Sequence, residues 1–242
     1  VARHGANVVT NYVSSAAAAE KVAEEIRSLG VKAIIVNANV SEQKEVESLF
    51  EHAIEAFGRG DIVMSNSGIE HFGALDEFIG DEIETVFNVN VKAQYFVAYQ
   101  AYKYMADNGR MVLTFSISAQ RLDCPFQSAS KGWAYQFERY LQGIPKHAVY
   151  ATSNAAIQGM IKCLAYDFGS KNVTVNCIAP GGVKTDMYAD VAADYILGGE
   201  KMTIEEIDEA LSKWSPVNRP GCLADIAGVI ALIASPEAQW LG

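Results

Sequence analysis

The chain has 242 residues, of which half are hydrophobic and a fifth are charged, as in ordinary globular domains. Its formal net charge of −10 argues against nucleic-acid binding, which favours a basic surface. No apolar run reaches the roughly 18 residues that a membrane-spanning helix needs. The four cysteines, Cys124, Cys163, Cys177 and Cys222, form no CxxC pair, so neither a disulfide framework nor a metal site is expected. Without a recognisable signal peptide, we expect a cytoplasmic protein.

Apolar strands alternate with helical segments along the whole chain. The pattern predicts strands at 6–12, 31–37, 61–65, 110–116 and 172–178, and helices at 16–29, 41–57, 81–106, 149–168, 203–213 and 223–234. Ser41 is the expected N-cap of the second helix, and Gly30 and Gly58 end the first two. Because the strands are uniformly apolar, both faces of the sheet should be covered. We therefore expect one α/β domain over residues 1–242, a doubly wound parallel sheet of the Rossmann-like kind.

Polar and glycine-containing motifs follow three of these strands. Asn66-Ser67-Gly68 follows the third, Ser116 and Ser118 lie at the end of the fourth, and Pro180-Gly181-Gly182 follows the fifth. Ligands of open parallel sheets bind beyond the carboxyl ends of the strands, where glycine permits close approach of the backbone. Each glycine alone could also form a plain turn, so the individual motifs leave the function open.

Taken in order, the motifs carry a family resemblance. Asn66-Ser67-Gly68, Asn88-Val89-Asn90, Ser116-Ile117-Ser118, Tyr150-Ala-Thr-Ser153 and the run from Pro180 to Thr185 resemble the signature of the short-chain dehydrogenase/reductase family. The strings SNSGIEHFG, GIPKHAVY, APGGVKTDMY and WSPVNRPG resemble, more narrowly, fungal polyketide reductases acting on hydroxynaphthalenones and versicolorin-type anthraquinones. The resemblance covers nearly the whole chain except residues 121–140. It implies NADPH-dependent reduction of an aromatic polyketide ketone to a secondary alcohol.

The end of the first strand bears on the choice of cofactor. NAD-specific sites usually place an acidic residue there, whereas this chain has Tyr12-Val13-Ser14-Ser15. Two hydroxyls at a helix N-terminus suit a phosphate group, although Ser14 and Ser15 could simply cap the helix. The resemblance implies NADPH and adds further cofactor contacts. These are Asn39, Val40, Asn66, Ser67, Gly68, Tyr150, Asn154, Pro180, Gly181, Gly182, Val183 and Thr185.

The resemblance also assigns catalytic roles. Tyr150 is the expected general acid, Ser116 the residue that holds the carbonyl oxygen, and Asn90 the anchor of a proton relay where the helix opens. The family has a lysine four residues after the tyrosine, on the same helix face, whereas this chain has Asn154. Loss of that charge should cost about 2–4 kcal/mol of transition-state stabilisation. The alternatives are a catalytically impaired relative that binds cofactor or pairs with other subunits, and a fragmentary or mis-spliced gene product.

Two further departures concern the course of the chain. Residues 121–140 are additional to the family pattern and contain Lys131, which could replace the missing cation only from a well-ordered loop. Alternatively, residues 121–140 could form a surface loop beside the site, or they could be the translation of an unspliced intron. The resemblance also implies a first strand with a glycine-rich phosphate loop before Val1, and a closing strand after Gly242. We therefore expect the chain to be truncated at both ends.

Aromatic and methionine side chains gather after Thr185. In the family this region, here about residues 187–214, forms a small lobe that closes over the substrate. Side chains of this type suit a flat phenolic ring system, although they could equally be the core of the lobe. The expected substrate contacts are Ser118, Met187, Tyr188, Tyr195 and Trp214. The long helices at 81–106 and 149–168 pair across subunits in the family, so a homo-tetramer or homodimer is expected.

Overall fold

The computed structural model describes residues 1–77, 80–119, 144–196 and 198–241. The additional segment 121–140, with Lys131 and Cys124, lies outside these ranges.

The described strands are all paired in parallel and form two ladders. In the first, β1 (Val8–Tyr12) pairs with β2 (Ala33–Asn37). In the second, β4 (Met105–Thr114) lies between β3 (Gly60–Ser65) and β5 (Thr174–Ile178). Within the described residues, no backbone ladder joins β1 to β3. The parallel pairing confirms the predicted class of sheet.

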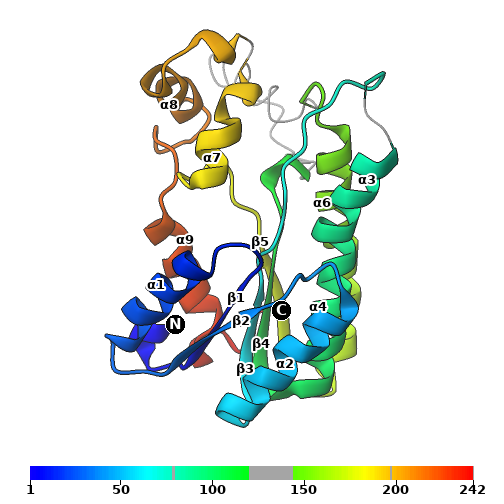
Figure 1. The fold of residues 1–242 in the computed structure, drawn as a ribbon, viewed down its shortest axis with the longest axis vertical. Coiled ribbons are helices and arrows are strands. Elements are labelled where there is room, and N and C mark those ends of the chain that lie inside the picture. The colour runs from blue at the N-terminus through cyan, green and yellow to red at the C-terminus, as the bar shows by residue number, and fades with distance from the viewer. Residues whose placement is uncertain (78–79, 120–143, 197, 242) are drawn as a thin grey trace.

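Helices cover both faces of these strands. Helices α1 (Ala16–Arg27) and α9 (Leu223–Ile233) lie on one side, as Figure 1 shows. Helices α2 (Gln43–Phe57), α4 (Ala93–Tyr104) and α6 (Ala148–Gly169) lie on the other. This arrangement is the doubly wound α/β fold that the apolar strands predicted.

Strand β4 shows how the core is divided between these layers. Because successive residues of a strand point to opposite faces, Met111 and Leu113 pack with the α4 and α6 side, whereas Val112 packs with Ile233 of α9. All three β4 side chains are fully buried. Both faces of the strand are thus covered by helices, which explains why residues 111–113 are all apolar.

A small lobe lies beyond the carboxyl ends of the strands. It consists of α7 (Asp186–Val191), α8 (Ile204–Ser212) and two 3₁₀ segments, Ala192–Tyr195 and Gly199–Lys201. Tyr188, Ala192 and Ile207 form its own apolar cluster. Further 3₁₀ segments are Ala2–His4, Ile117–Ala119 and Pro236–Ala238. No helix in the described part of the chain combines the length and apolar character needed to cross a membrane.

Two predicted element boundaries were wrong. The N-cap of α2 is Glu42 rather than Ser41, because the Ser41 hydroxyl donates to the Asn39 side chain instead. The predicted helix 81–106 is not continuous: α3 (Gly80–Phe87) runs into a π-helical segment, Asn88–Lys92, before α4 begins. The last two residues of the predicted helix belong to β4, because Met105 pairs with Gly60 of β3.

Candidate active site

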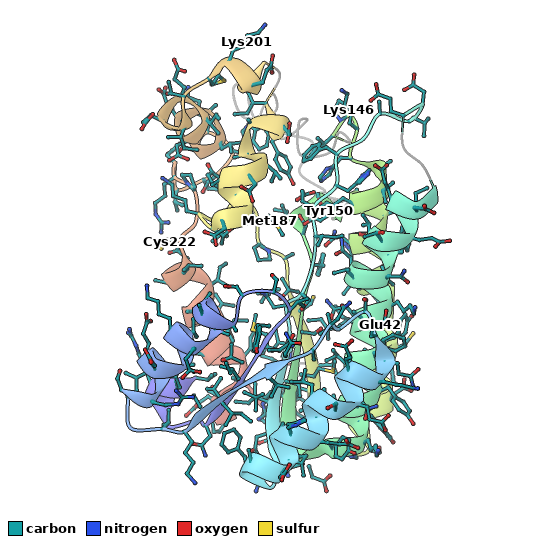
Figure 2. The ribbon with its side chains drawn as sticks, in the orientation of Figure 1. Glu42, Lys146, Tyr150, Met187, Lys201 and Cys222 are labelled. Carbon is teal, nitrogen blue, oxygen red and sulfur yellow. The ribbon has the colours of Figure 1, made fainter. Side chains whose placement is uncertain are left out.

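Two sequence-predicted catalytic residues meet where β4 and α6 approach each other. Ser116 lies just past the end of β4, and Tyr150 lies in the first turn of α6, as Figure 2 shows for the tyrosine. The Tyr150 hydroxyl interacts with the Ser116 side chain. The Ser118 hydroxyl donates to Ser116 Oγ at 2.9 Å, and the Ser118 backbone N–H lies 3.2 Å from the same oxygen. Ser118 therefore orients the hydroxyl that faces Tyr150.

Asn154 occupies the position of the family's lysine and connects the end of β4 to the start of α6. Its Oδ1 accepts a hydrogen bond from the Ser116 backbone N–H at 2.8 Å, and its Nδ2 donates to the Tyr150 carbonyl at 2.9 Å. The residue is only 6% exposed. Its amide also interacts with the Tyr150 hydroxyl. The side chain thus holds the end of β4 against α6, but it brings no positive charge.

Asn90 lies in the π-helical segment, so the helix opens at the position where the resemblance implied a relay. Its Nδ2 donates to the Ile69 carbonyl at 2.9 Å and to Ser153 Oγ at 3.1 Å, and its Oδ1 accepts from the Ile69 N–H at 2.8 Å. Ser153 Oγ in turn donates to the Tyr150 carbonyl at 2.8 Å. Asn90 therefore joins the loop after β3 to the first turn of α6. Short π segments of this kind are frequent at functional sites.

Glu70 is a site residue that the sequence analysis missed. Its side chain is 8% exposed, and Oε2 accepts a hydrogen bond from the Tyr195 hydroxyl at 2.9 Å. His147 Nε2 lies 3.4 Å from Oε1, and the Tyr150 hydroxyl also interacts with the carboxyl group. A carboxyl residue two positions after Asn66-Ser67-Gly68, between Ile69 and His71, was the available signal.

Burial dominates the electrostatics of the described site residues, none of which is a lysine or an arginine. Desolvation raises the pKa of Glu70 to about 7, and desolvation lowers the pKa of His147 to about 4. Burial, with the Glu70 carboxyl second, raises the pKa of Tyr150 to about 12. Burial also raises the pKa of Tyr195. Between about pH 4 and pH 7 these groups therefore favour their uncharged forms, and the proton of Tyr150 is tightly held.

Aromatic rings connect the start of α6 with the small lobe. The centroid of the Phe72 ring lies 4.5 Å from that of His147 and 5.0 Å from that of Tyr195. Phe72 and Tyr195 meet edge to face. The ring centroids of His147 and Tyr150 are 4.7 Å apart. Tyr195 and Tyr150 thus both lie against His147, and the role of Tyr195 as a substrate contact stays a prediction. Such a ring cluster suits a flat aromatic ligand.

The other predicted substrate residues are placed differently. Tyr188 is buried in the core of the small lobe, where its hydroxyl donates to Asp208 at 2.7 Å. This placement favours the core role that the sequence left open. Met187, on α7, is 40% exposed, and Trp214 follows α8 in a partly buried position.

The predicted cofactor residues lie at the carboxyl edge of the strands. Ser15 Oγ accepts from the Ala18 N–H at 3.4 Å and so caps α1, while Ser14 is exposed. Asn37 Nδ2 donates to the Val13 carbonyl at 2.7 Å, which ties this loop to the end of β2. Because the loop from Tyr12 to Ser15 has hydroxyls, backbone N–H groups and no carboxylate, its donor set fits a phosphate group.

The remaining cofactor candidates come from three other strand ends. Asn66, Ser67 and Gly68 are exposed after β3, and an added Cβ at Gly68 would lie 3.5 Å from Asn90 Oδ1. After β5, the Pro180 carbonyl accepts a hydrogen bond from the Ile117 N–H at 3.2 Å, and Gly181 and Gly182 are exposed. Val183 forms an isolated β-bridge with Gly221, and Thr185 is the N-cap of α7. Asn39 and Val40 follow β2, with the Val40 side chain turned into the core.

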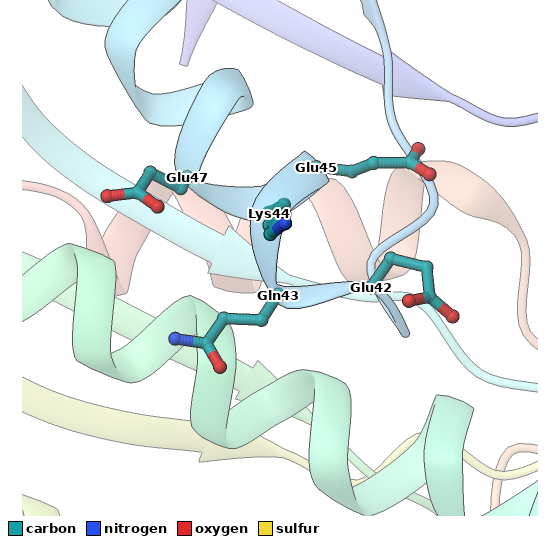
Figure 3. Close-up of a pocket in the computed structure, with 5 residues that line it drawn as sticks. All are labelled: Glu42, Gln43, Lys44, Glu45 and Glu47. Carbon is teal, nitrogen blue, oxygen red and sulfur yellow. The ribbon is translucent and has the colours of Figure 1, made fainter.

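A surface hollow lies apart from Ser116 and Tyr150, at the start of α2. It is lined by Glu42, Gln43, Lys44, Glu45 and Glu47, as Figure 3 shows. Glu45 accepts a hydrogen bond from the Asn39 N–H at 2.7 Å. The lining carries three carboxylates and one lysine, so it does not resemble a phosphate site. Over the described ranges, no cluster of His, Cys, Asp and Glu could hold a metal ion.

Comparison with known proteins identifies the family. A family model described as short chain dehydrogenase matches residues 1–143, and one described as Enoyl-(Acyl carrier protein) reductase matches residues 134–241. The chain belongs to the short-chain dehydrogenase/reductase family. It is therefore an oxidoreductase of the carbonyl/alcohol class that works with a nicotinamide cofactor, as its motifs predicted.

Relatives of this short-chain reductase include fungal enzymes of similar length. Versicolorin reductase 1 of Dothistroma septosporum is 43% identical over 239 residues, covering 99% of this chain and 83% of that protein. A probable tetrahydroxynaphthalene reductase of Zymoseptoria tritici is 42% identical over 241 residues, covering 100% and 83%. Elsinochrome reductase 1 of Elsinoe fawcettii is 40% identical over 241 residues, with the same coverage.

Solved structures of bacterial family members have the same fold. A short-chain dehydrogenase/reductase from Serratia marcescens superposes with a TM-score of 0.81 at 29% identity, covering 99% of this chain and 84% of that one. A short chain dehydrogenase from Burkholderia cenocepacia, solved in complex with NADP, gives a TM-score of 0.77 at 28% identity, covering 100% and 85%.

Proposed function

We propose that this reductase uses NADPH to reduce a ketone on an aromatic polyketide, of the hydroxynaphthalenone or anthraquinone type, to a secondary alcohol. The observation that carries the proposal is the Ser116–Tyr150 pair, placed beside the ring cluster of Phe72, His147 and Tyr195. The printed names of the fungal relatives point to substrates of the same class.

The residues present fit a phosphate-bearing dinucleotide. The hydroxyls of Ser14 and Ser15 at the start of α1 would receive the 2′-phosphate of the ribose, and the exposed glycines after β5 would let the backbone approach the cofactor. When bound, NADPH supplies the hydride for the reduction. The absence of a carboxylate between Tyr12 and Ser15 is what favours NADPH over NADH.

The chain's own groups hold the carbonyl oxygen and supply its proton. Ser116, oriented by Ser118, donates a hydrogen bond to the oxygen. Tyr150 donates its phenolic proton to the same oxygen as negative charge develops there. Asn90 fixes the first turn of α6 through Ser153, and Asn154 fixes Ser116 relative to Tyr150. The ring cluster orients the aromatic substrate and excludes water from the oxygen.

A second candidate function is that of a cofactor-binding relative with impaired chemistry. Asn154 favours it, because the side chain is uncharged and its amide is engaged with Ser116 and Tyr150. A positive charge beside the developing phenolate is worth about 10²–10³ in rate. The two candidates differ in turnover and agree in NADPH binding.

The deciding experiment follows NADPH oxidation with a hydroxynaphthalenone-type ketone. The unaltered protein is compared with Tyr150→Phe, with Asn154→Lys, and with Thr152→Ala as the control on the exposed face of α6. We expect turnover in the unaltered protein and its loss in Tyr150→Phe, with NADPH binding retained in both. Activity in Asn154→Lys alone would identify the impaired relative, and activity in Tyr150→Phe would contradict the assignment of the acid.

We also propose that the reductase is a homo-tetramer or homodimer. Tyr95, Tyr99 and Tyr102 recur at helical spacing on α4 and are exposed, as is Tyr166 on α6. A row of exposed aromatic side chains is typical of a protein–protein interface. Light scattering during size-exclusion chromatography should give a mass above that of the monomer, and Tyr99→Glu should reduce it.

A further inference from the structure

Glu70 lies between the small lobe and the start of α6, and the roles proposed so far do not use it. Its carboxyl group is faced by Tyr195 of the lobe at 2.9 Å, by His147 and Tyr150 from the start of α6, and by the neighbouring His71 N–H at 3.4 Å. With a side chain 8% exposed, the carboxyl group is largely removed from water. It therefore meets Tyr150 inside the site rather than at its surface.

Among the described residues, the groups that face Glu70 do not neutralise a carboxylate. The pKa of His147 is lowered to about 4, so the imidazole is uncharged at neutral pH. The two tyrosines and the His71 N–H donate hydrogen bonds without adding charge. A buried carboxylate in such surroundings is costly, and the pKa of Glu70 accordingly rises to about 7. Below that pH the carboxyl group carries a proton.

Tyr150 needs a proton source after each reduction. Once its proton has gone to the substrate oxygen, Tyr150 is left as a phenolate whose conjugate acid has a pKa of about 12. The other side chains that interact with its oxygen are the Ser116 hydroxyl and the Asn154 amide, which are far weaker acids than a carboxyl group. In the family pattern a lysine stands at position 154, whereas here that position carries no charge. Within the part of the chain that the structure describes, Glu70 is the carboxylic acid that interacts with the Tyr150 oxygen.

We propose that Glu70 returns the proton to Tyr150 after each ketone reduction and so takes over part of the work of the missing lysine. This inference rests on the proposed reductase function. In the step, the O–H bond of the Glu70 carboxyl group breaks and the O–H bond of Tyr150 forms, leaving tyrosine and a carboxylate. Water entering the site then reprotonates the carboxylate. No electrons move in either step, and Glu70 acts through Tyr150 as a relay and positioning residue.

The first test needs no turnover. Infrared difference spectroscopy between pH 5 and pH 9 should show the carbonyl band of a buried protonated carboxyl group in the ligand-free protein. The band should be absent in Glu70→Gln and unchanged in Glu84→Gln, an exposed glutamate on α3 that serves as the matched control. A spectrum without the band, or a band that persists in Glu70→Gln, would overturn the proposal whatever the enzyme activity.

The second test compares the first turnover with later ones. In Glu70→Gln the first NADPH oxidation should proceed close to the parental rate, because Tyr150 still carries its proton. Steady-state kcat should then fall by about tenfold or more. The parent should lose kcat as pH rises through about 7, and Glu70→Gln should lose that pH dependence. Glu70→Asp, which keeps a carboxyl group, should restore the pH dependence.

The outcomes separate the relay from a merely structural role and from failure of the reductase assignment. If Glu70→Gln keeps the parental kcat, or lowers kcat while the fall above pH 7 persists, Glu70 is only a contact for Tyr195 and the relay is refuted. If no ketone is turned over by the parent while the infrared band is present, the proposed function fails, and with it the relay's catalytic use. The protonated carboxyl group beside Tyr150 stands in that case.

Discussion

Replacing Asn154 by alanine tests whether this residue holds the site together. The substitution removes the acceptor of the Ser116 N–H and the donor to the Tyr150 carbonyl, at a position 6% exposed. Leaving one buried backbone N–H without a partner costs about 1–3 kcal/mol. With the second hydrogen bond and the lost packing, we expect the free energy of unfolding to fall by about 3 kcal/mol.

Equilibrium urea unfolding followed by circular dichroism measures this change. Thr152→Ala, two residues earlier on the exposed face of α6, is the control and should change stability by less than about 0.5 kcal/mol. Asn154→Asp separates the two hydrogen bonds. It keeps the acceptor for Ser116, and its buried carboxyl group regains a donor when protonated, so its stability should recover as the pH is lowered. A loss below about 1 kcal/mol in Asn154→Ala would refute the bracing role.

Three further predictions concern other parts of the molecule. Asn90→Ala removes three hydrogen bonds from a buried position and should lower stability by about 2–4 kcal/mol in urea unfolding, whereas Asn88→Ala should change it far less. The raised pKa of Glu70 stabilises the fold fully below pH 4.5, and this contribution is lost as the pH rises through about 7. Glu70→Gln should therefore gain up to about 3 kcal/mol relative to the parent between pH 5 and pH 8; an equal difference at both values would contradict the shift. Arg219 holds the pKa of Asp225 well below its usual range, so the carboxylate is still ionised at pH 3, and Asp225→Asn should lower the melting temperature at pH 7 and, by less, at pH 3.

The sheet was predictable because its strands are buried on both faces. Apolar runs such as 111–113 can satisfy that environment only between two layers of helices. The family resemblance implied that the predicted helix 81–106 opens at Asn90, whereas its end at Tyr104 was not predictable in the same way. No glycine or proline interrupts the stretch from 88 to 106, and the change to strand at Met105 depends on pairing with Gly60, which lies 45 residues earlier.

Ser116 and Tyr150 differ from Glu70 in how far they could be predicted from the sequence. Ser116 and Tyr150 stand in motifs, so the sequence alone singled them out. Glu70 acquires its properties from Tyr195, 125 residues further along the chain, and from the burial that the small lobe provides. Periodicity and local spacing carry no information about such a contact. The role of Asn154 as a brace likewise depends on Ser116, 38 residues away.

The acidic hollow at the start of α2 has a consequence for association kinetics. Its carboxylates follow β2, and Glu45 reaches back to Asn39, a residue expected to contact the cofactor. A dinucleotide phosphate approaching this edge meets negative potential, on a chain whose net charge is −10. Added salt screens this repulsion over a Debye length of about 10 Å at 0.1 M. The association rate constant for NADPH should therefore rise with ionic strength, the reverse of an electrostatically steered encounter.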